Sequence, residues 1–295
     1  INLHHNWYIV LTNILSNKII SSQLSNLGLK KGDTVFVLSN LVALGPVKNV
    51  SNKIEFCETY YNAIRDVIGD DGTLVVPTYT SQVGREGINF ILEETPCMTG
   101  IFSEHIRKKD TSTRSIHPIN SLTSIGPNQS YICENNSTSD FGWDSPFDRL
   151  NNLKCKVISI GLTAAFSLGI LHYIEALFGL PYRYNKILDV DTIVNGKKDN
   201  RAFFITARYL NIKLLYNEAS WVLPLSKSKK IAGKEVGNGY IFIADFDAAV
   251  RIARENLIRN PYFFLETEPH FIKGDIPFDG PTIKRDNKIK HEEKI

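Results

Sequence analysis

Asp33–Ser39 reads DTVFVLS, a short apolar and β-branched run with polar residues at both ends, which is typical of a buried strand. The same pattern predicts four more strands, at residues 72–80, 156–162, 201–210 and 240–243. Between them, apolar residues recur at helical spacing in 19–27, 54–68, 101–107, 166–178 and 245–257. Strands that alternate with helices predict an α/β fold with helices on both faces of one sheet.

The composition is that of an ordinary globular protein of 295 residues, with 43% hydrophobic and 22% charged residues. It excludes a collagen-like chain, a coiled coil and a disordered chain. The net charge of +3 is too small and too dispersed to indicate a nucleic-acid-binding protein. Residues 1–280 are expected to form one domain, and the lysine- and arginine-rich segment 281–295 is expected to be a disordered tail.

The four cysteines are widely spaced and form no CxxC pair. They therefore indicate reduced thiols and a cytoplasmic protein, without a structural zinc site. The first residues lack the pattern of a signal peptide. Residues 160–180 are strongly apolar, but His172, Glu175, Gly169 and Gly179 interrupt them, which favours a buried helix over a membrane span.

His172 is the leading candidate for chemistry, because it lies on an otherwise apolar helix and Glu175 follows three positions later on the same face. A carboxylate can hold a histidine in one tautomer and so make it a general base. The alternative is a core histidine that makes only a structural hydrogen bond.

Three polar segments are further candidates. Residues 114–121 read RSIHPINS, which predicts a loop able to hold phosphate or amide groups. Residues 37–41 lie at the end of a strand, where unpaired backbone amides can bind an anion. Residues 181–186 read PYRYNK, an aromatic and basic run. Each has an ordinary reading as a turn or a solvated loop. The chain contains no GxGxxG, GxxxxGK[ST], GxSxG or HExxH motif, so a dinucleotide fold, a P-loop, a hydrolase elbow and a catalytic metal are not predicted.

Taken in order, these segments resemble the aminoglycoside 3-N-acetyltransferase family. The matching pieces are GDTVFVLS at 32–39, GTLVVPTYT at 72–80, TG at 99–100, RSIHP at 114–118, SPF at 145–147 and LHYIE at 171–175. The resemblance implies a single-domain, three-layer α/β/α sandwich. It also implies an acyl-CoA-dependent N-acyltransferase that needs no metal and acylates the primary amine of a sugar.

By this resemblance, His172 is the general base for direct attack by the amine, without a covalent enzyme intermediate. Its carboxylate partner is left open between Glu175, Glu218 and Asp189. The expected coenzyme A ligands are Ser39, Asn40, Thr78, Thr80, Arg114, Ser115, His117 and Ser121. One departure is Leu38-Ser39-Asn40, which stands where the family often has His-Ser-Ser.

The acceptor is expected to be anionic, because the isoelectric point of about 8.5 suits it better than a polycation. The preferred reading is the amine of a nucleotide-linked amino sugar in surface polysaccharide biosynthesis. The residues expected to bind it are Tyr182, Arg183, Tyr184, Arg208 and Tyr209. Two alternatives remain: an antibiotic-resistance acetyltransferase for aminoglycosides, and a non-catalytic ligand-binding protein. The oligomeric state is open, with a homodimer as one option.

Overall fold

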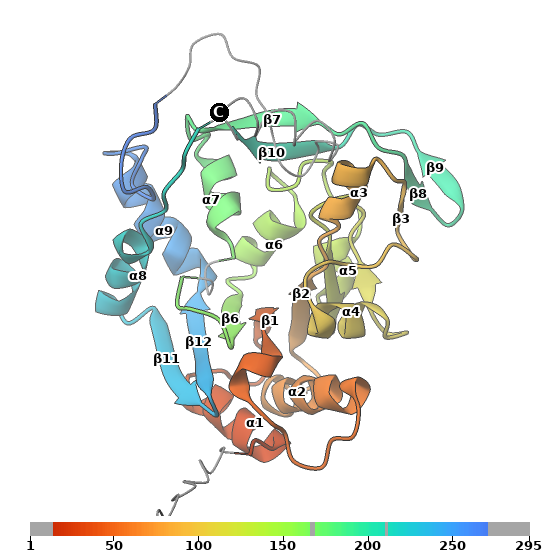
Figure 1. The fold of residues 1–295 in the computed structure, drawn as a ribbon, viewed down its shortest axis with the longest axis vertical. Helices are drawn as coiled ribbons and strands as arrows, with labels where there is room; N and C mark the ends of the chain where they lie inside the picture. Colours follow the sequence, from red (N-terminus) through yellow and green to blue (C-terminus); the bar gives the residue numbers. More distant parts are fainter. Residues whose placement is uncertain (1–13, 166–168, 210–211, 271–295) are drawn as a thin grey trace, which may run out of the picture.

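The computed structural model describes residues 14–165, 169–209 and 212–270. A seven-stranded mixed sheet in the order β11-β12-β6-β1-β2-β5-β4 forms its centre (Figure 1). Strand β1 pairs in parallel with β2 on one side and with β6 on the other, and the outer strands are added antiparallel. The bounds are β1 Thr34–Ser39, β2 Thr73–Pro77, β4 Thr113–Arg114, β5 Leu122–Ile125, β6 Lys156–Ile160, β11 Ile231–Val236 and β12 Gly239–Asp245.

Helices cover both faces of this sheet. Because successive strand side chains point to opposite faces, Val35 and Val37 pack with one group of helices and Phe36 with the other. Each fully buried side chain of this size contributes about 1.5–3 kcal/mol to stability. On the Val35 face lie α1 Asn17–Asn26, α2 Lys53–Ile68 and α4 Ile101–Arg107; on the Phe36 face lie α5 Gln129–Cys133, α6 Pro146–Asn152, α7 Leu171–Leu177, α8 Glu218–Lys227 and α9 Phe246–Leu257. The predicted three-layer α/β/α sandwich is confirmed.

Two small sheets lie outside the central one. Strands β7 Arg183–Ile187 and β10 Phe204–Arg208 pair antiparallel and run across the end of the molecule next to α7 (Figure 1). Strands β3 Phe90–Ile91, β8 Thr192–Val194 and β9 Lys197–Asp199 form the second sheet. The short elements η1 Leu41–Leu44 and α3 Ser81–Glu86 follow β1 and β2. The segment 201–210 was predicted as a strand. It contains β10, which pairs with β7 in an outer sheet and is not part of the central sheet.

The stretch 112–147 is dense in serine, asparagine, glycine and proline, yet it is not one long loop. It contains β4, β5 and α5, and its end enters α6, where the Ser145 side chain caps the helix and Pro146 occupies the first turn. Its strands were missed because they are short and rich in serine and threonine. No helix in the described part of the chain is long and apolar enough to cross a membrane. Residues 166–168 and the expected tail 281–295 lie outside the described residues.

Candidate active site

The site lies at the carboxyl ends of the parallel strands, where open α/β sheets usually bind their ligands. Two glycines bring the chain against the end of β1. A Cβ on Gly161 would lie 2.2 Å from the carbonyl oxygen of Asn40, and a Cβ on Gly169 would lie 2.4 Å from Cδ1 of Leu38. These close approaches place the residues that follow β6, and with them the start of α7, beside the end of β1.

His172 and Glu175 are in direct contact on α7. Nδ1 of His172 lies 2.8 Å from Oε2 of Glu175, as expected for side chains three positions apart in a helix. The His172 side chain is 51% exposed, whereas that of Glu175 is fully buried. Since Nδ1 faces the carboxylate, Nε2 at the opposite edge of the ring is the nitrogen that can meet a substrate. The ring also lies 6.3 Å from that of Phe141, measured between centroids.

Glu175 has two more partners. Nη2 of Arg183 lies 2.5 Å from Oε2, and the hydroxyl of Tyr216 donates to Oε1 at 2.9 Å. Burial on its own would raise the pKa of Glu175, but the His172 hydrogen bond and the Arg183 charge outweigh it, and the pKa is lowered. The carboxylate therefore stays ionised beside the imidazole.

A pocket of about 260 Å³ opens next to His172. Its lining residues are Ala165, Gly169, Leu171, His172, Tyr216, Glu218 and Trp221. The three candidate carboxylates lie in different places. Glu175 is the partner of His172, Glu218 lines the pocket wall at the first turn of α8, and Asp189 is exposed between β7 and β8.

Of the expected coenzyme A ligands, two are at the surface of this region. Ser39 is half-buried at the end of β1, and Asn40 is exposed directly after it. Thr78 and Thr80 follow β2 but are fully buried. The hydroxyl of Thr78 bonds with Ser121 and Thr123, and that of Thr80 donates to the carbonyl of Pro118.

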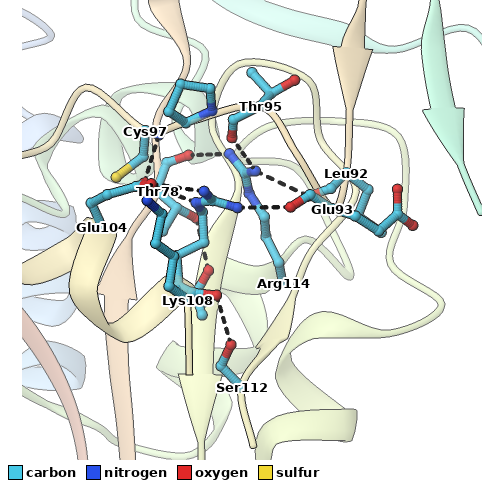
Figure 2. Close-up of polar contacts among 12 residues, drawn as sticks. Thr78, Leu92, Glu93, Thr95, Cys97, Glu104, Lys108, Ser112 and Arg114 are labelled. Atoms are coloured by element: carbon cyan, nitrogen blue, oxygen red, sulfur yellow. Dashed lines mark hydrogen bonds and ion pairs between the residues drawn. The ribbon is translucent and has the colours of Figure 1, made fainter. Parts of the chain in front are cut away.

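Arg114 is directed into the protein (Figure 2). Its Nε donates to the hydroxyl of Ser121, Nη1 to the carbonyls of Leu92 and Thr95, and Nη2 to the carbonyl of Thr78, at 2.7–3.1 Å. Burial lowers the pKa of Arg114 to about 10, so the side chain remains charged at neutral pH. All three guanidinium nitrogens therefore stabilise the chain's own loops.

Ser115 and His117 are also buried in this loop. The Ser115 hydroxyl accepts from the amide of Leu122. Nδ1 of His117 accepts from the amides of Ile119 and Asn120, so Nε2 carries the hydrogen and donates to the carbonyl of Phe204 at 2.9 Å. Burial lowers the pKa of His117 to about 4, which keeps the ring neutral. A direct role for Arg114, Ser115, His117 and Ser121 in cofactor binding stays a prediction that their burial does not favour.

The residues expected to bind an anionic acceptor lie on or beside the paired strands β7 and β10, where Arg183 is opposite Arg208, but they differ in burial. Tyr182 is fully buried in the core, and the Arg183 side chain is 6% exposed and engaged with Glu175. The rings of Tyr184 and Tyr209 are tilted relative to each other with centroids 4.8 Å apart, and Arg208 is exposed on β10. Arg183, chosen as a phosphate-binding cation, instead neutralises a buried carboxylate.

Sequence reasoning missed Tyr216, Trp221 and Phe141, which surround His172. Tyr216 lies 41 positions from Glu175, so no local pattern could connect them. The four cysteines are buried and unpaired. Burial raises the pKa of Cys133 to about 12 and that of Cys155 as well, which disfavours a thiolate nucleophile. Within the described ranges, no group of three histidine, cysteine or carboxylate side chains is arranged to hold a metal.

An N-acyltransferase is the class of protein that this fold and this histidine–carboxylate pair suggest, and comparison with known proteins supplies the family. The family model described as aminoglycoside 3-N-acetyltransferase matches residues 36–258. The chain therefore belongs to the aminoglycoside 3-N-acetyltransferase family, and the expectation of an acyl-CoA-dependent N-acyltransferase is confirmed.

Relatives of known name are similar over most of the chain. Aminoglycoside N(3)-acetyltransferase VII of Streptomyces paromomycinus is 29% identical over 203 residues, which cover 62% of this chain and 68% of the relative. Aminoglycoside N(3)-acetyltransferase VIII of Streptomyces fradiae is 27% identical, covering 61% and 67%. The crystal structure of aminoglycoside acetyltransferase AAC(3)-Xa superimposes with a TM-score of 0.70 at 22% identity, over 82% of this chain and 92% of that chain, and thus shares the fold.

These relatives correct the expected acceptor. They are named for aminoglycosides, and none of them points to a nucleotide-linked sugar or to polysaccharide biosynthesis. The error came from using the charge of the whole chain to infer the charge of one pocket. Arg183, which was expected to bind the acceptor, is paired with Glu175, while the pocket wall carries Glu218.

Proposed function

We propose that the protein transfers an acetyl group from acetyl-CoA to an amino group of an aminoglycoside. The observation that carries the proposal is the His172–Glu175 pair at the wall of a pocket that also contains Glu218. The names of the relatives support the same acceptor class. The direct reaction forms a C–N bond and breaks the C–S bond of the thioester, and no enzyme acyl intermediate is needed.

His172 is proposed to manage the proton. An amine must be uncharged to attack a thioester, so a base has to take a proton as the new bond forms. Nε2 of His172 accepts it, and Glu175 stabilises the resulting imidazolium through Nδ1. The proton then protonates the departing thiolate, so that coenzyme A leaves as the thiol. A general base of this kind contributes about 10²–10⁴-fold to the rate.

Glu218 is proposed to select the acceptor. Aminoglycosides carry several ammonium groups, and a carboxylate on the wall of a mostly apolar pocket favours such a cation. Leu171 and Trp221 supply apolar surface on the same walls. Of the predicted cofactor ligands, Ser39 and Asn40 have the exposure needed to contact the thioester substrate.

The test is to incubate the purified protein with acetyl-CoA and sisomicin or gentamicin. Release of the coenzyme A thiol and a mass increase of one acetyl group on the aminoglycoside are expected, and His172→Asn should abolish most of both. A ligand-binding protein without activity is the competing function. It would show thermal stabilisation by these ligands with no acetylated product, and that result would contradict the proposal.

A further inference from the structure

Three polar atoms converge at the inner edge of the His172 ring. Nδ1 of His172 lies 2.8 Å from Oε2 of Glu175 and 2.8 Å from Nη2 of Arg183, and the last two atoms lie 2.5 Å apart. A carboxylate oxygen only accepts hydrogen bonds, and a guanidinium nitrogen only donates them. In a neutral ring, Nδ1 can therefore satisfy one of these two neighbours at a time.

The tautomer of His172 depends on which of the two neighbours forms a hydrogen bond with Nδ1. If Nδ1 carries the hydrogen and donates to Glu175, Nε2 is free to accept a proton. If instead Arg183 donates to a bare Nδ1, the hydrogen sits on Nε2, and the ring can no longer act as a base toward a substrate. The two arrangements differ only in the position of hydrogens.

The number of hydrogens on Arg183 and Tyr216 determines which tautomer of His172 is satisfied. Nη2 of Arg183 has two hydrogens. It lies 2.5 Å from Oε2 of Glu175 and 2.9 Å from the hydroxyl of Tyr216, whose own hydrogen donates to Oε1 of Glu175 at 2.9 Å. With both Nη2 hydrogens taken by these oxygens, none remains for Nδ1. The atoms Nδ1, Nη2, Oε1, Oε2 and the Tyr216 hydroxyl oxygen are then all satisfied only when Nδ1 carries the ring hydrogen, whereas Nε of Arg183 has no hydrogen-bond partner among the described residues.

We propose that Arg183 and Tyr216 are positioning residues that hold His172 in the Nδ1–H tautomer and oppose its protonation. The catalytic consequence of this inference rests on the proposed function, whereas the tautomer itself does not. In the described part of the chain, the ionisable groups that the contacts place against the His172 ring are Glu175 on α7, Arg183 at the start of β7 and Glu218 on α8. Tyr182, before β7, and Tyr216, before α8, lie beside Glu175.

The first test is Tyr216→Phe, which keeps the aromatic ring and removes the hydroxyl. One Nη2 hydrogen of Arg183 becomes available to Nδ1, so the Nε2–H tautomer should become populated. Ring ¹⁵N chemical shifts report the tautomer directly, and the signal of His172 is assigned by its loss in His172→Asn. His117 supplies an internal reference, since its contacts give it the Nε2–H form. The half-exposed Tyr240→Phe is the matched control.

The same variant should lower kcat roughly tenfold, the equivalent of one net hydrogen bond, with KM for the acceptor nearly unchanged. A His172 tautomer in Tyr216→Phe that is identical to that of the wild type would overturn the inference. If the wild type acetylates no aminoglycoside but the tautomer changes in Tyr216→Phe, the proposed function fails and this inference stands.

The second test removes the Arg183 charge. In Arg183→Gln the His172–Glu175 pair should bind a proton more readily, so the acid limb of kcat/KM should move to higher pH by about one unit. In Arg183→Lys the acid limb of kcat/KM should return to its wild-type pH, because lysine supplies a positive charge at the same place. Arg259→Gln, at an exposed site after α9, is the matched control. An unmoved limb in folded Arg183→Gln would overturn the proposed charge effect. If the glutamine variant does not fold, Arg183→Met, which also removes the charge but buries no unpaired amide, is compared with Arg183→Lys in the same way.

Discussion

Nδ1 of His172 and Oε2 of Glu175 lie 2.8 Å apart across one turn of α7, with the imidazole half-exposed to a pocket and the carboxylate fully buried. This difference in exposure gives the two side chains different tasks. The buried group can hold a charge in place without meeting solvent, and the exposed ring can exchange a proton with a substrate.

His172→Asn should therefore lower kcat by about two to four decades. Asparagine retains a polar group near Glu175 but offers no basic nitrogen. Binding of coenzyme A, measured by calorimetry, should be unchanged, and thermal unfolding should show a folded protein. Turnover within threefold of the wild type would assign the base to another residue.

Glu175→Gln should lower stability by about 3–5 kcal/mol, because it leaves the buried guanidinium of Arg183 without its counter-charge. The pKa of Glu175 is lowered in the folded state from its usual value near 4.5. Its contribution to stability is thus present above about pH 4.5 and is lost as the pH falls through the folded-state value. Urea unfolding of both proteins at pH 7 and at successively lower pH measures this, and a penalty that does not shrink on acidification would contradict it.

Glu218→Gln should raise KM for an aminoglycoside about 5- to 10-fold while kcat changes little, since one exposed carboxylate–ammonium contact contributes about 1 kcal/mol. The effect should weaken at high salt because the pair is partly solvated. Glu235→Gln, at an exposed site on β11, is the control. Equal KM values for the two variants would remove Glu218 from acceptor recognition.

Arg114→Lys should cost about 2–4 kcal/mol of stability, because one ammonium group cannot replace a guanidinium that donates to four acceptors in different directions (Figure 2). KM for acetyl-CoA in the folded variant should stay within about twofold of the wild type, as expected for a residue that acts within the loops. A large rise in KM with unchanged stability would instead show that Arg114 contacts the cofactor. Arg251→Lys, at an exposed position of α9, should change neither quantity.

Asp140 should make stability depend on pH in the opposite sense from Glu175. Burial raises its pKa to about 6, although Thr206 and Asn120 donate hydrogen bonds to it. Its favourable contribution is present below about pH 3.8 and is lost as the pH rises through about 6, a change of about 3 kcal/mol. The difference in unfolding free energy between the wild type and Asp140→Asn should decrease by that amount between about pH 3 and pH 7. A difference that is constant over this range would show that Asp140 titrates normally.

Local sequence determined much of the architecture. The apolar runs around Val35, Leu74 and Val157 form three adjacent strands of the central sheet, and α4 has the bounds that its spacing predicted. The motif LHYIE placed His172 and Glu175 on one helical face, since residues three apart in a helix meet without help from the rest of the fold. Family membership also followed from short motifs in a fixed order.

Only the tertiary structure decided which polar groups are exposed at the pocket and which are buried. Arg183 and Tyr216 reach Glu175 from 8 and 41 positions away, and Arg114 turns inward to carbonyls 19 to 36 positions distant. A sequence pattern reports which residues share a local face, but burial and long-range pairing determine whether a charge is available to a ligand. For that reason the net charge of the chain suggested an acceptor that the relatives do not support, whereas the pocket beside His172 is lined by a carboxylate, Glu218.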